Sequence, residues 1–254
     1  MKRLLCAGCG CWCDIKRRAM LLNGVTATLF FNNSISTAQI LSMSVFFGGN
    51  RMNSNYVTFN HPDENLGGLS NLNLDYPIAV NGVRMPTAEH LFQGLRYRSA
   101  MIQAATISVE HPISARRFAA SKAFRDQTCE RWRQNQLEIM EFCLKTKLLW
   151  NWVKFGRLLR STEGKTIYML STRNEYWGVL ACNDGFVGKN HMGQLLMKLR
   201  DELLSDNNEH LRTLTPPQHL DLKFLGQPIQ AKDRRDHVRQ VGIRTTEMVN
   251  ALRP

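Results

Sequence analysis

The sequence lacks any long uninterrupted apolar run in its 254 residues. A membrane-spanning helix needs about 18 or more consecutive apolar residues, and no window of this chain supplies them. Residues 19–31 follow the basic run Lys16-Arg17-Arg18, but no small-residue cleavage site marks them as a signal sequence. We therefore expect neither a membrane protein nor a membrane partner.

The cysteines lack the second half of a zinc site. Four of the seven lie close to the start of the chain, at Cys6, Cys9, Cys11 and Cys13. Structural zinc sites usually pair two Cys/His knuckles separated by a longer span, so we expect no metal and no cofactor. The other three are scattered without pairing logic, at Cys129, Cys143 and Cys182. Unpaired cysteines are typical of a reducing compartment, which favours a cytoplasmic location.

Acidic residues are few, 21 against 33 Lys and Arg, which leaves a net charge of +12. Residues 1–51 carry six basic side chains and one acid, residues 52–204 carry nineteen and fourteen, and residues 205–254 carry eight and six. A basic surface favours phosphate-bearing partners. Because nearly half of the excess lies outside residues 52–204, charge alone is weak evidence for a nucleic-acid-binding protein.

Three segments differ in pattern. Residues 1–51 show no sustained hydrophobic period, and the stretch Gly48–Met52 can be encoded by a purine-rich ribosome-binding sequence followed by a start codon. We interpret them as a leader that is disordered or absent from the native product, with a genuine targeting leader as the alternative. Residues 52–204 are predicted to be the working domain. Residues 205–254 are interpreted as an appendage, with a linker at Thr215-Pro216-Pro217 and a basic helix near 233–252.

Within 52–204 the periodicity predicts short strands and several helices. The Asn81-Gly82 pair predicts a hairpin turn after the second strand. A long loop over 172–191 carries an aromatic residue and several polar ones, a composition that favours a binding loop. The predicted strands are 56–59, 77–80 and 166–171, and the predicted helices begin with the stretch after Pro86 and continue at 99–107, 112–120, 129–152 and 192–204.

The stretch Met85–Tyr97 is the most informative. Thr87 is predicted to be a helix N-cap, and at about 100° per residue Glu89, Gln93 and Arg96 share one stripe. One interpretation is a surface helix with its acid near the positive end of the macrodipole. The other is a ligand site, with Gly94 leaving room beside the polar stripe.

Lys147 falls within an apolar stripe of the predicted helix 129–152. Its companions at helical spacing are Met140, Cys143 and Leu144. Such a lysine either snorkels toward water or lines a pocket, where desolvation lowers its pKa and makes it a better nucleophile. Both interpretations are kept.

Five motifs in order give a family resemblance over roughly residues 56–204. They are Gly68-Leu69-Ser70-Asn71, Pro86-Thr87-Ala88-Glu89-His90-Leu91-Phe92-Gln93, Met140 through Lys147-Leu148, Tyr176-Trp177-Gly178, and Gly188-Lys189-Asn190 with Leu196-Met197-Lys198-Leu199-Arg200. The chain resembles the NADAR superfamily of YbiA-like proteins. The resemblance implies an α+β fold, a mostly helical single domain with a small β-sheet. It also implies an N-glycosidase that cleaves a ribosyl N-glycosidic bond, in ADP-ribosylated guanine or in a ribosylamino-pyrimidine phosphate.

Taken with the chemistry of the side chains, the resemblance yields a set of candidate residues. The candidate catalytic residues are Glu89, Lys147 and Glu175. The candidate substrate-binding residues are Ser70, Asn71, Gln93, Arg96, Asn174, Trp177, Gly178, Lys189 and Asn190. The expected partner is a phosphorylated ribosyl or ADP-ribosyl substrate, either free or carried on nucleic acid.

Two positions depart from the family pattern. Asn174 stands where members carry Asp, and Met169 stands where many carry Glu at the end of the preceding strand. Glu175 is the one acid beside them. Losing carboxylates favours a second interpretation, a module that binds ADP-ribose or a related nucleotide without turning it over.

Overall fold

The computed structural model describes residues 55–183 and 185–234. The predicted leader lies outside the described residues, as does nearly all of the predicted basic helix near 233–252. The described part is α+β and mostly helical, which confirms the predicted fold class. The helices are α2 (Ala88–Gly94), α3 (Ala100–Ile107), α4 (Pro112–Ala119), α5 (Trp132–Trp150), α6 (Trp152–Arg160) and α7 (His191–Leu204), joined by the short 3₁₀ helices η1 (Gly67–Leu69), η2 (Lys122–Gln127), η3 (Glu209–Arg212) and η4 (Gln218–Leu220).

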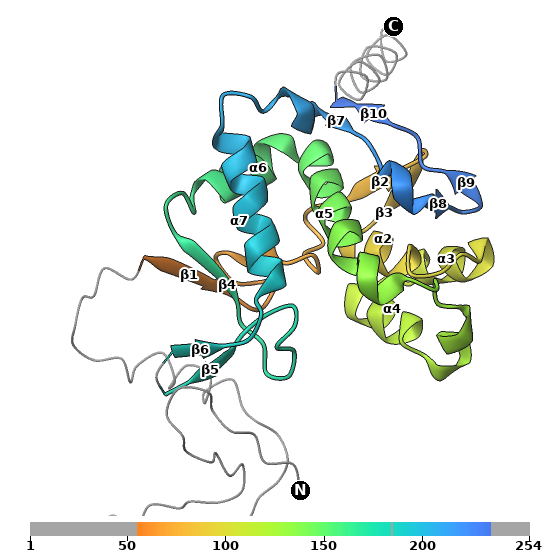
Figure 1. The fold of residues 1–254 in the computed structure, drawn as a ribbon, viewed down its shortest axis with the longest axis horizontal. Helices are drawn as coiled ribbons and strands as arrows, with labels where there is room; N and C mark the ends of the chain where they lie inside the picture. Colours follow the sequence, from red (N-terminus) through yellow and green to blue (C-terminus); the bar gives the residue numbers. More distant parts are fainter. Residues whose placement is uncertain (1–54, 184, 235–254) are drawn as a thin grey trace, which may run out of the picture. The chain divides into compact units, whose positions relative to one another are not determined.

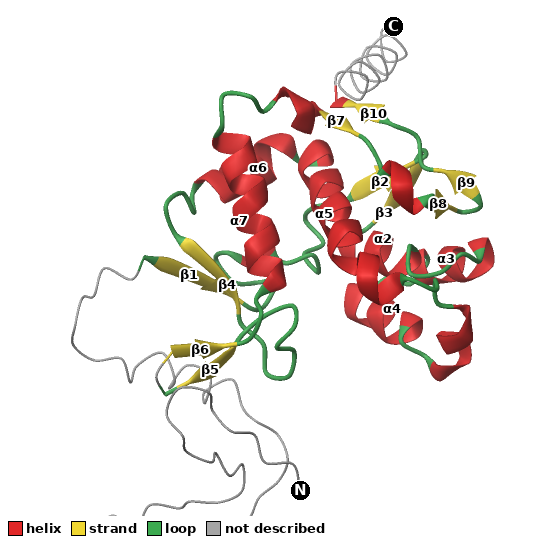
Figure 2. Ribbon diagram, in the orientation of Figure 1, coloured by secondary structure: helices red, strands yellow, loops and turns green. Residues whose placement is uncertain are grey.

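The strands form five separate pairs. They are β1 (Tyr56–Phe59) with β4 (Thr166–Met169), β2 (Ile78–Val80) with β3 (Val83–Met85), β5 (Leu180–Cys182) with β6 (Gly185–Val187), β7 (Thr213–Leu214) with β10 (Lys232–Asp233), and β8 (Lys223–Phe224) with β9 (Gln227–Pro228). The long helix α5 runs between α7 on one side and α2 on the other (Figure 1). The strand pairs lie around this helical core (Figure 2).

Helix α2 is stabilised by packing, because a helix of seven residues is marginal by itself. All seven residues are buried. Thr87 occupies the predicted N-cap with an extended backbone, but its hydroxyl bonds Nδ1 of His90 at 2.9 Å and caps no amide. The prediction that Gly94 leaves room for a ligand is wrong. A Cβ there would lie 3.4 Å from Cγ2 of Ile107, so the glycine allows close packing against α3.

The hairpin between β2 and β3 forms as predicted. Asn81 and Gly82 have φ values of 49° and 80°, which suits the mirror-image turns that match the twist of an antiparallel pair. The pair β1–β4 is parallel and joins residues more than 100 positions apart, with Tyr56 opposite Thr166. The side chains that follow β1 and β4 reach the candidate site described below.

The edge of β4 that faces away from β1 is completed by one side chain. The amide of Asn190 accepts a hydrogen bond from the Met169 N–H at 3.1 Å and donates to the Ile167 carbonyl at 2.8 Å. It thereby imitates the peptide group of a neighbouring strand. The ladder continues where the Val179 N–H donates to the Met169 carbonyl at 2.8 Å. Asn190 is buried and has a φ of 51°, in the left-handed region.

The structure differs from the prediction in two segments between residues 129 and 191. The loop expected over 172–191 contains the β5–β6 hairpin, so only part of it is irregular. The predicted helix 129–152 begins at Trp132 and breaks at Asn151, and α6 then continues the chain. Asn151 sits at φ −122° and ψ 40°, and its side-chain amide donates to the Pro77 and Lys147 carbonyls.

The prediction that the chain beyond residue 204 is a separate appendage is wrong for residues 205–234. Four apolar side chains of this segment belong to the main core, each at most 6% exposed: Leu211, Leu214, Phe224 and Ile229. The buried amide of Gln103 fastens the segment by donating to the Lys223 carbonyl and accepting from the Leu225 N–H. Within the described residues, no helix is long and apolar enough to cross a membrane.

Candidate active site

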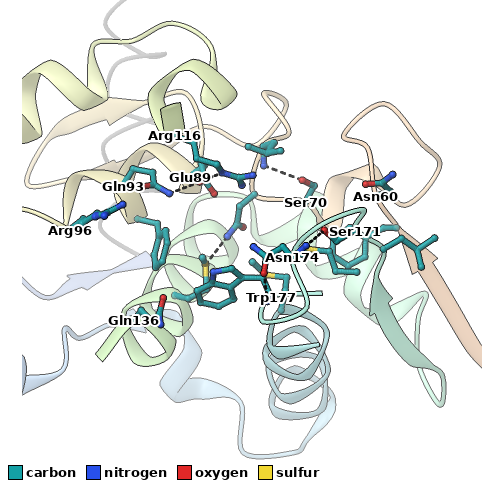
Figure 3. Close-up of a pocket in the computed structure, with 18 of the residues that line it drawn as sticks. Asn60, Ser70, Glu89, Gln93, Arg96, Arg116, Gln136, Ser171, Asn174 and Trp177 are labelled. Atoms are coloured by element: carbon teal, nitrogen blue, oxygen red, sulfur yellow. Dashed lines mark hydrogen bonds and ion pairs between the residues drawn. The ribbon is translucent and has the colours of Figure 1, made fainter. Parts of the chain in front are cut away.

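A pocket of about 360 Å³ lies where α2, the loop after η1, the end of β4 and the start of α5 meet (Figure 3). Its lining combines aromatic, amide and charged groups. The lining residues are Phe59, Asn60, Ser70, Asn71, Leu72, Glu89, Phe92, Gln93, Arg96, Arg116, Trp132, Gln136, Met140, Met169, Leu170, Ser171, Asn174, Trp177 and Met192.

The pocket brings together seven of the twelve candidate residues. They are Ser70, Asn71, Glu89, Gln93, Arg96, Asn174 and Trp177. The predicted stripe of α2 therefore faces a cavity instead of open solvent. Phe92, which precedes Gln93 on the same buried helix, also lines the pocket.

Glu89 is the one carboxylate among the lining residues, and it is 2% exposed. Its Oε1 accepts a hydrogen bond from Nε2 of Gln93 and one from Nε of Arg116, each at 2.8 Å (Figure 3). No hydrogen bond from a described residue reaches Oε2. One oxygen is thus fixed by two donors while the other is left for a ligand or water.

Arg116 connects the buried carboxylate to the pocket mouth, because its side chain is 51% exposed while that of Glu89 is 3% exposed. Burial lowers the pKa of Arg116, but the charge and hydrogen bond of Glu89 outweigh it and raise the pKa overall. The guanidinium is therefore permanently charged beside Glu89. Its exposed end can still bind an anion.

Two buried polar atoms in the pocket wall have no partner. Nε of Arg96 and Oδ1 of Asn71 are inaccessible to solvent and make no hydrogen bond, and the Asn71 amide nitrogen contacts only Sδ of Met140, at 3.0 Å. Unsatisfied buried groups are costly in a folded protein and are concentrated where function requires them. With Arg96 and Arg116 against one carboxylate, the lining carries a net positive charge.

Aromatic rings form the wall opposite the carboxylate. Trp177 stands perpendicular to Phe92 with centroids 5.6 Å apart, and Phe92 packs on Trp132 at 4.9 Å. The backbone of Trp177 is held by a turn. The backbone N–H groups of Trp177 and Tyr176 both donate to Oδ1 of Asn174, at 3.0 and 3.1 Å.

The prediction that Lys147 lines the pocket is wrong. Its ammonium is buried behind η1 and donates to the Gly68 and Ser70 carbonyls at 2.6 and 2.8 Å. It also lies over the rings of Tyr76 and Phe155. Burial lowers the pKa of Lys147 well below its usual value. Lys147 holds the loop that carries Ser70 and Asn71, and an attack on substrate would require it to leave both carbonyls.

Four further candidates lie outside the pocket lining. The side-chain amide of Asn190 is hydrogen-bonded to the backbone of β4, as described above. Gly178 provides space for β4, because a Cβ there would lie 2.4 Å from the Met169 carbonyl oxygen. Glu175 is exposed and contributes its backbone carbonyl to the Lys189 N–H. Lys189 is exposed too, with its ammonium 5.6 Å from the Tyr176 ring centroid. The placement of all four in the site is therefore corrected.

Arg116 is a pocket residue that the sequence does not reveal. It follows Glu89 by 27 residues and lies on α4, a segment for which the sequence predicts only a helix over 112–120. Asn60, Gln136 and Ser171 were missed as well, because each follows or interrupts an element with no motif around it. Among the described residues, no group of three or more His, Cys, Asp or Glu side chains lies close enough to hold a metal ion.

The fold and the site define a class: a small α+β domain whose pocket presents one buried carboxylate, two arginines and an aromatic wall. A family model described as the NADAR domain matches residues 58–204. The chain belongs to the NADAR domain family.

Three similar proteins extend this result. The chain is 30% identical over 149 residues to the riboflavin biosynthesis protein VVA0006 of Vibrio vulnificus, and the match covers 58% of this chain and 38% of that protein. It is 28% identical to N-glycosidase YbiA of Escherichia coli, covering 60% of this chain and 91% of YbiA. The NMR structure of Escherichia coli YbiA has a TM-score of 0.53 at 26% identity, covering 62% and 89% of the two chains.

Proposed function

We propose that the protein is an N-glycosidase that hydrolyses the bond between the anomeric carbon of a ribose and a nitrogen. The observation that carries the proposal is Glu89, a buried carboxylate with one oxygen fixed by two donors and the other free in the pocket. The names of the YbiA relatives support the reaction class. They leave the substrate of this chain open.

Glu89 has two tasks in this reaction. The C–N bond breaks with its electron pair going to the departing nitrogen, and positive charge builds on the anomeric carbon and ring oxygen. The free oxygen of Glu89 stabilises that charge and then takes a proton from the attacking water. General-base assistance of this kind contributes about 10²–10⁴-fold in rate. Gln93 and Arg116 keep the carboxylate oriented through both steps.

The charge of the lining favours a phosphorylated substrate. Arg96 has a buried Nε without a partner, and the exposed end of Arg116 lies at the mouth. Guanidinium groups bind phosphate oxygens in pairs of hydrogen bonds. Trp177 offers a face for the base, which is worth roughly 1–3 kcal/mol by stacking. Ser70, Asn71 and Gln93 would then bind ribose hydroxyls. A phosphoribosyl or ADP-ribosyl substrate has all three parts.

The decisive experiment compares Glu89→Gln with the unchanged chain on two substrates, ADP-ribosylated guanine in DNA and a ribosylamino-pyrimidine phosphate. We expect release of free base by the unchanged chain and a loss of roughly 10²–10⁴-fold in Glu89→Gln. The thermal midpoint should hold, because glutamine keeps the size and most hydrogen bonds. Glu175→Gln is the matched control, since that acid is exposed and outside the lining, and it should turn over normally. Normal turnover by Glu89→Gln would refute the assignment.

A second candidate, a binding module without turnover, is favoured by one observation. Asn174 and Met169 leave Glu89 as the sole carboxylate of the pocket lining, whereas glycosidases that protonate a leaving group use a pair. This alternative predicts that ADP-ribose binds while neither substrate releases base. The same assays therefore separate the two candidates.

A further inference from the structure

A second cavity, of about 630 Å³, lies on the other side of Trp132 from the candidate active site. It is formed by the chain after α2, the first turns of α5 and the segment from η4 to β8. Its lining residues are Leu95, Tyr97, Arg98, Cys129, Glu130, Arg131, Trp132, Asn135, Ile139, His219, Leu220, Asp221, Leu222 and Lys223. Residues 219–223 lie beyond the family match at 58–204, so the matched residues alone do not build this cavity.

The segment that closes the cavity is fastened to the domain. Gln103 is 1% exposed, and its amide bonds the Tyr97 and Lys223 carbonyls at 2.6 and 3.0 Å. Phe224, the next residue, is 1% exposed within the main core. His219 bonds Oε2 of Glu138 on α5 at 3.0 Å. The cavity is therefore a preformed space between anchored elements.

The rim carries cations without carboxylate partners. Arg98 and Arg131 are exposed, and neither forms an ion pair within the described part of the chain. The charge of Lys223 is balanced by Asp221, whose Oδ2 lies 3.6 Å from the lysine Nζ. Glu130 is then the only other acid among the lining residues. Two guanidinium groups against one carboxylate favour an anion, and arginine is suited to the paired oxygens of a phosphate.

The wall behind this rim is apolar and partly aromatic. It includes Trp132, Ile139, Leu220 and Leu222. Ligand sites typically combine such a wall with a few polar groups that fix orientation. A ligand that fits both parts has a flat apolar body and a phosphate.

We propose that this cavity is a second ligand site, which takes an aromatic phosphate of the size of a nucleoside monophosphate. Arg98 and Arg131 bind the phosphate, and the base packs against the apolar wall. Trp132 lines both cavities and packs on Phe92 of the candidate active site. The two sites therefore share one wall residue. The site does not depend on the proposed N-glycosidase activity.

The test uses adenosine monophosphate and the full chain, with binding measured by titration calorimetry. Because this probe also fits the candidate active site, two variants separate the sites. Arg98→Gln with Arg131→Gln should weaken one binding event at least tenfold, and Arg96→Gln should weaken only the other. The matched control is Arg84→Gln with Arg173→Gln, which removes the same charge from two exposed arginines outside both cavities.

Alkylation gives the location independently. Cys129 lines the second cavity, whereas Cys182 is exposed and is not among the residues that line it. Adenosine monophosphate should slow iodoacetamide labelling of Cys129, mapped by peptide mass, and leave Cys182 unchanged. The proposal fails if no binding is detected, if Arg96→Gln removes all of it, or if the control pair lowers affinity as much as the rim pair. Loss of base release in Glu89→Gln would leave every one of these results unaffected.

Discussion

Replacing Asn190 tests whether this residue is a clamp on β4 or, as sequence alone suggests, a substrate ligand. Asn190→Ala removes the acceptor of the Met169 N–H and the donor to the Ile167 carbonyl, both buried. Leaving a buried polar group unsatisfied costs about 1–3 kcal/mol. Alanine at a left-handed φ of 51° adds about 1 kcal/mol. Two such groups and the backbone term together give an expected loss of about 3–7 kcal/mol, a large share of the roughly 5–15 kcal/mol by which typical domains are stable.

Gly193 provides the matched second perturbation. A Cβ on Gly193 would lie 2.1 Å from the Ile167 carbonyl oxygen and 2.4 Å from Nδ2 of Asn190. Gly193→Ala should therefore break the same clamp from the other side. Asn190→Gly keeps the backbone conformation without strain, so it should lose about 1 kcal/mol less than Asn190→Ala. Gly193→Ala should also cost less in the Asn190→Gly background, because part of the collision is gone.

The measurement is guanidinium unfolding followed by far-UV circular dichroism. A clamp predicts a lower midpoint with an unchanged slope for both single substitutions. A substrate ligand predicts a loss of only about 1 kcal/mol for Asn190→Ala, from the left-handed backbone alone, and almost none for Asn190→Gly. If Asn190→Ala loses no more than that, the clamp is refuted.

Two further outcomes follow from burial. Phe224→Ala should destabilise the domain by about 3–5 kcal/mol, because Phe224 is 1% exposed in the main core. The control Val187→Ala, at a site 47% exposed, should change the free energy of unfolding little. If Phe224→Ala left the free energy of unfolding unchanged, the appendage interpretation would be restored. Burial lowers the pKa of His90, so the unfolded chain binds more protons and stability falls as pH drops through about 6.5. Urea unfolding of His90→Gln at pH 5 to 8 should show a smaller loss of stability toward acid pH than the unchanged chain. An equal loss in both proteins would exclude His90 as its source.

The α2 stripe was predictable because a fixed angle per residue decides which side chains share a face. Glu89 and Gln93 line one pocket for that reason, and Arg96 joins them from the turn after α2. The residues that cover this face come from segments distant in sequence. Arg116 lies on α4, and Trp177 lies in a loop whose backbone is bonded by Asn174.

Two polar residues have roles in the fold that the sequence does not reveal. The apolar stripe around Lys147 leaves open whether it snorkels or lines a pocket, and the family resemblance suggests Asn190 as a substrate ligand. In the fold the partners are backbone carbonyls, of Gly68 and Ser70 for one and of Ile167 for the other. A backbone group has no side-chain signature, so the path of the chain must be known before it can be counted as a partner.

The segment beyond 204 shows the same limit. Its strands are two residues long and its helices are single turns, so no sustained period marks the segment as a whole. Leu211 lies between His210 and Arg212 and is nevertheless buried, and a lone apolar residue among polar ones predicts exposure as readily as burial. The proline pair in this segment was therefore read as a linker.

Asn174 departs from the family in charge but not in architecture. Its Oδ1 accepts from the Tyr176 and Trp177 N–H groups, and its own N–H donates to Oγ of Ser171 at 2.9 Å. An aspartate oxygen would accept the same two bonds, because the turn requires only an acceptor. The substitution keeps Trp177 in place and removes a negative charge from the lining. With Met169 also uncharged, the pocket holds two guanidinium groups against Glu89 alone. Under the proposed function, that balance suits a substrate that brings its own negative charge, and a leaving nitrogen that departs without a proton from a second carboxylate.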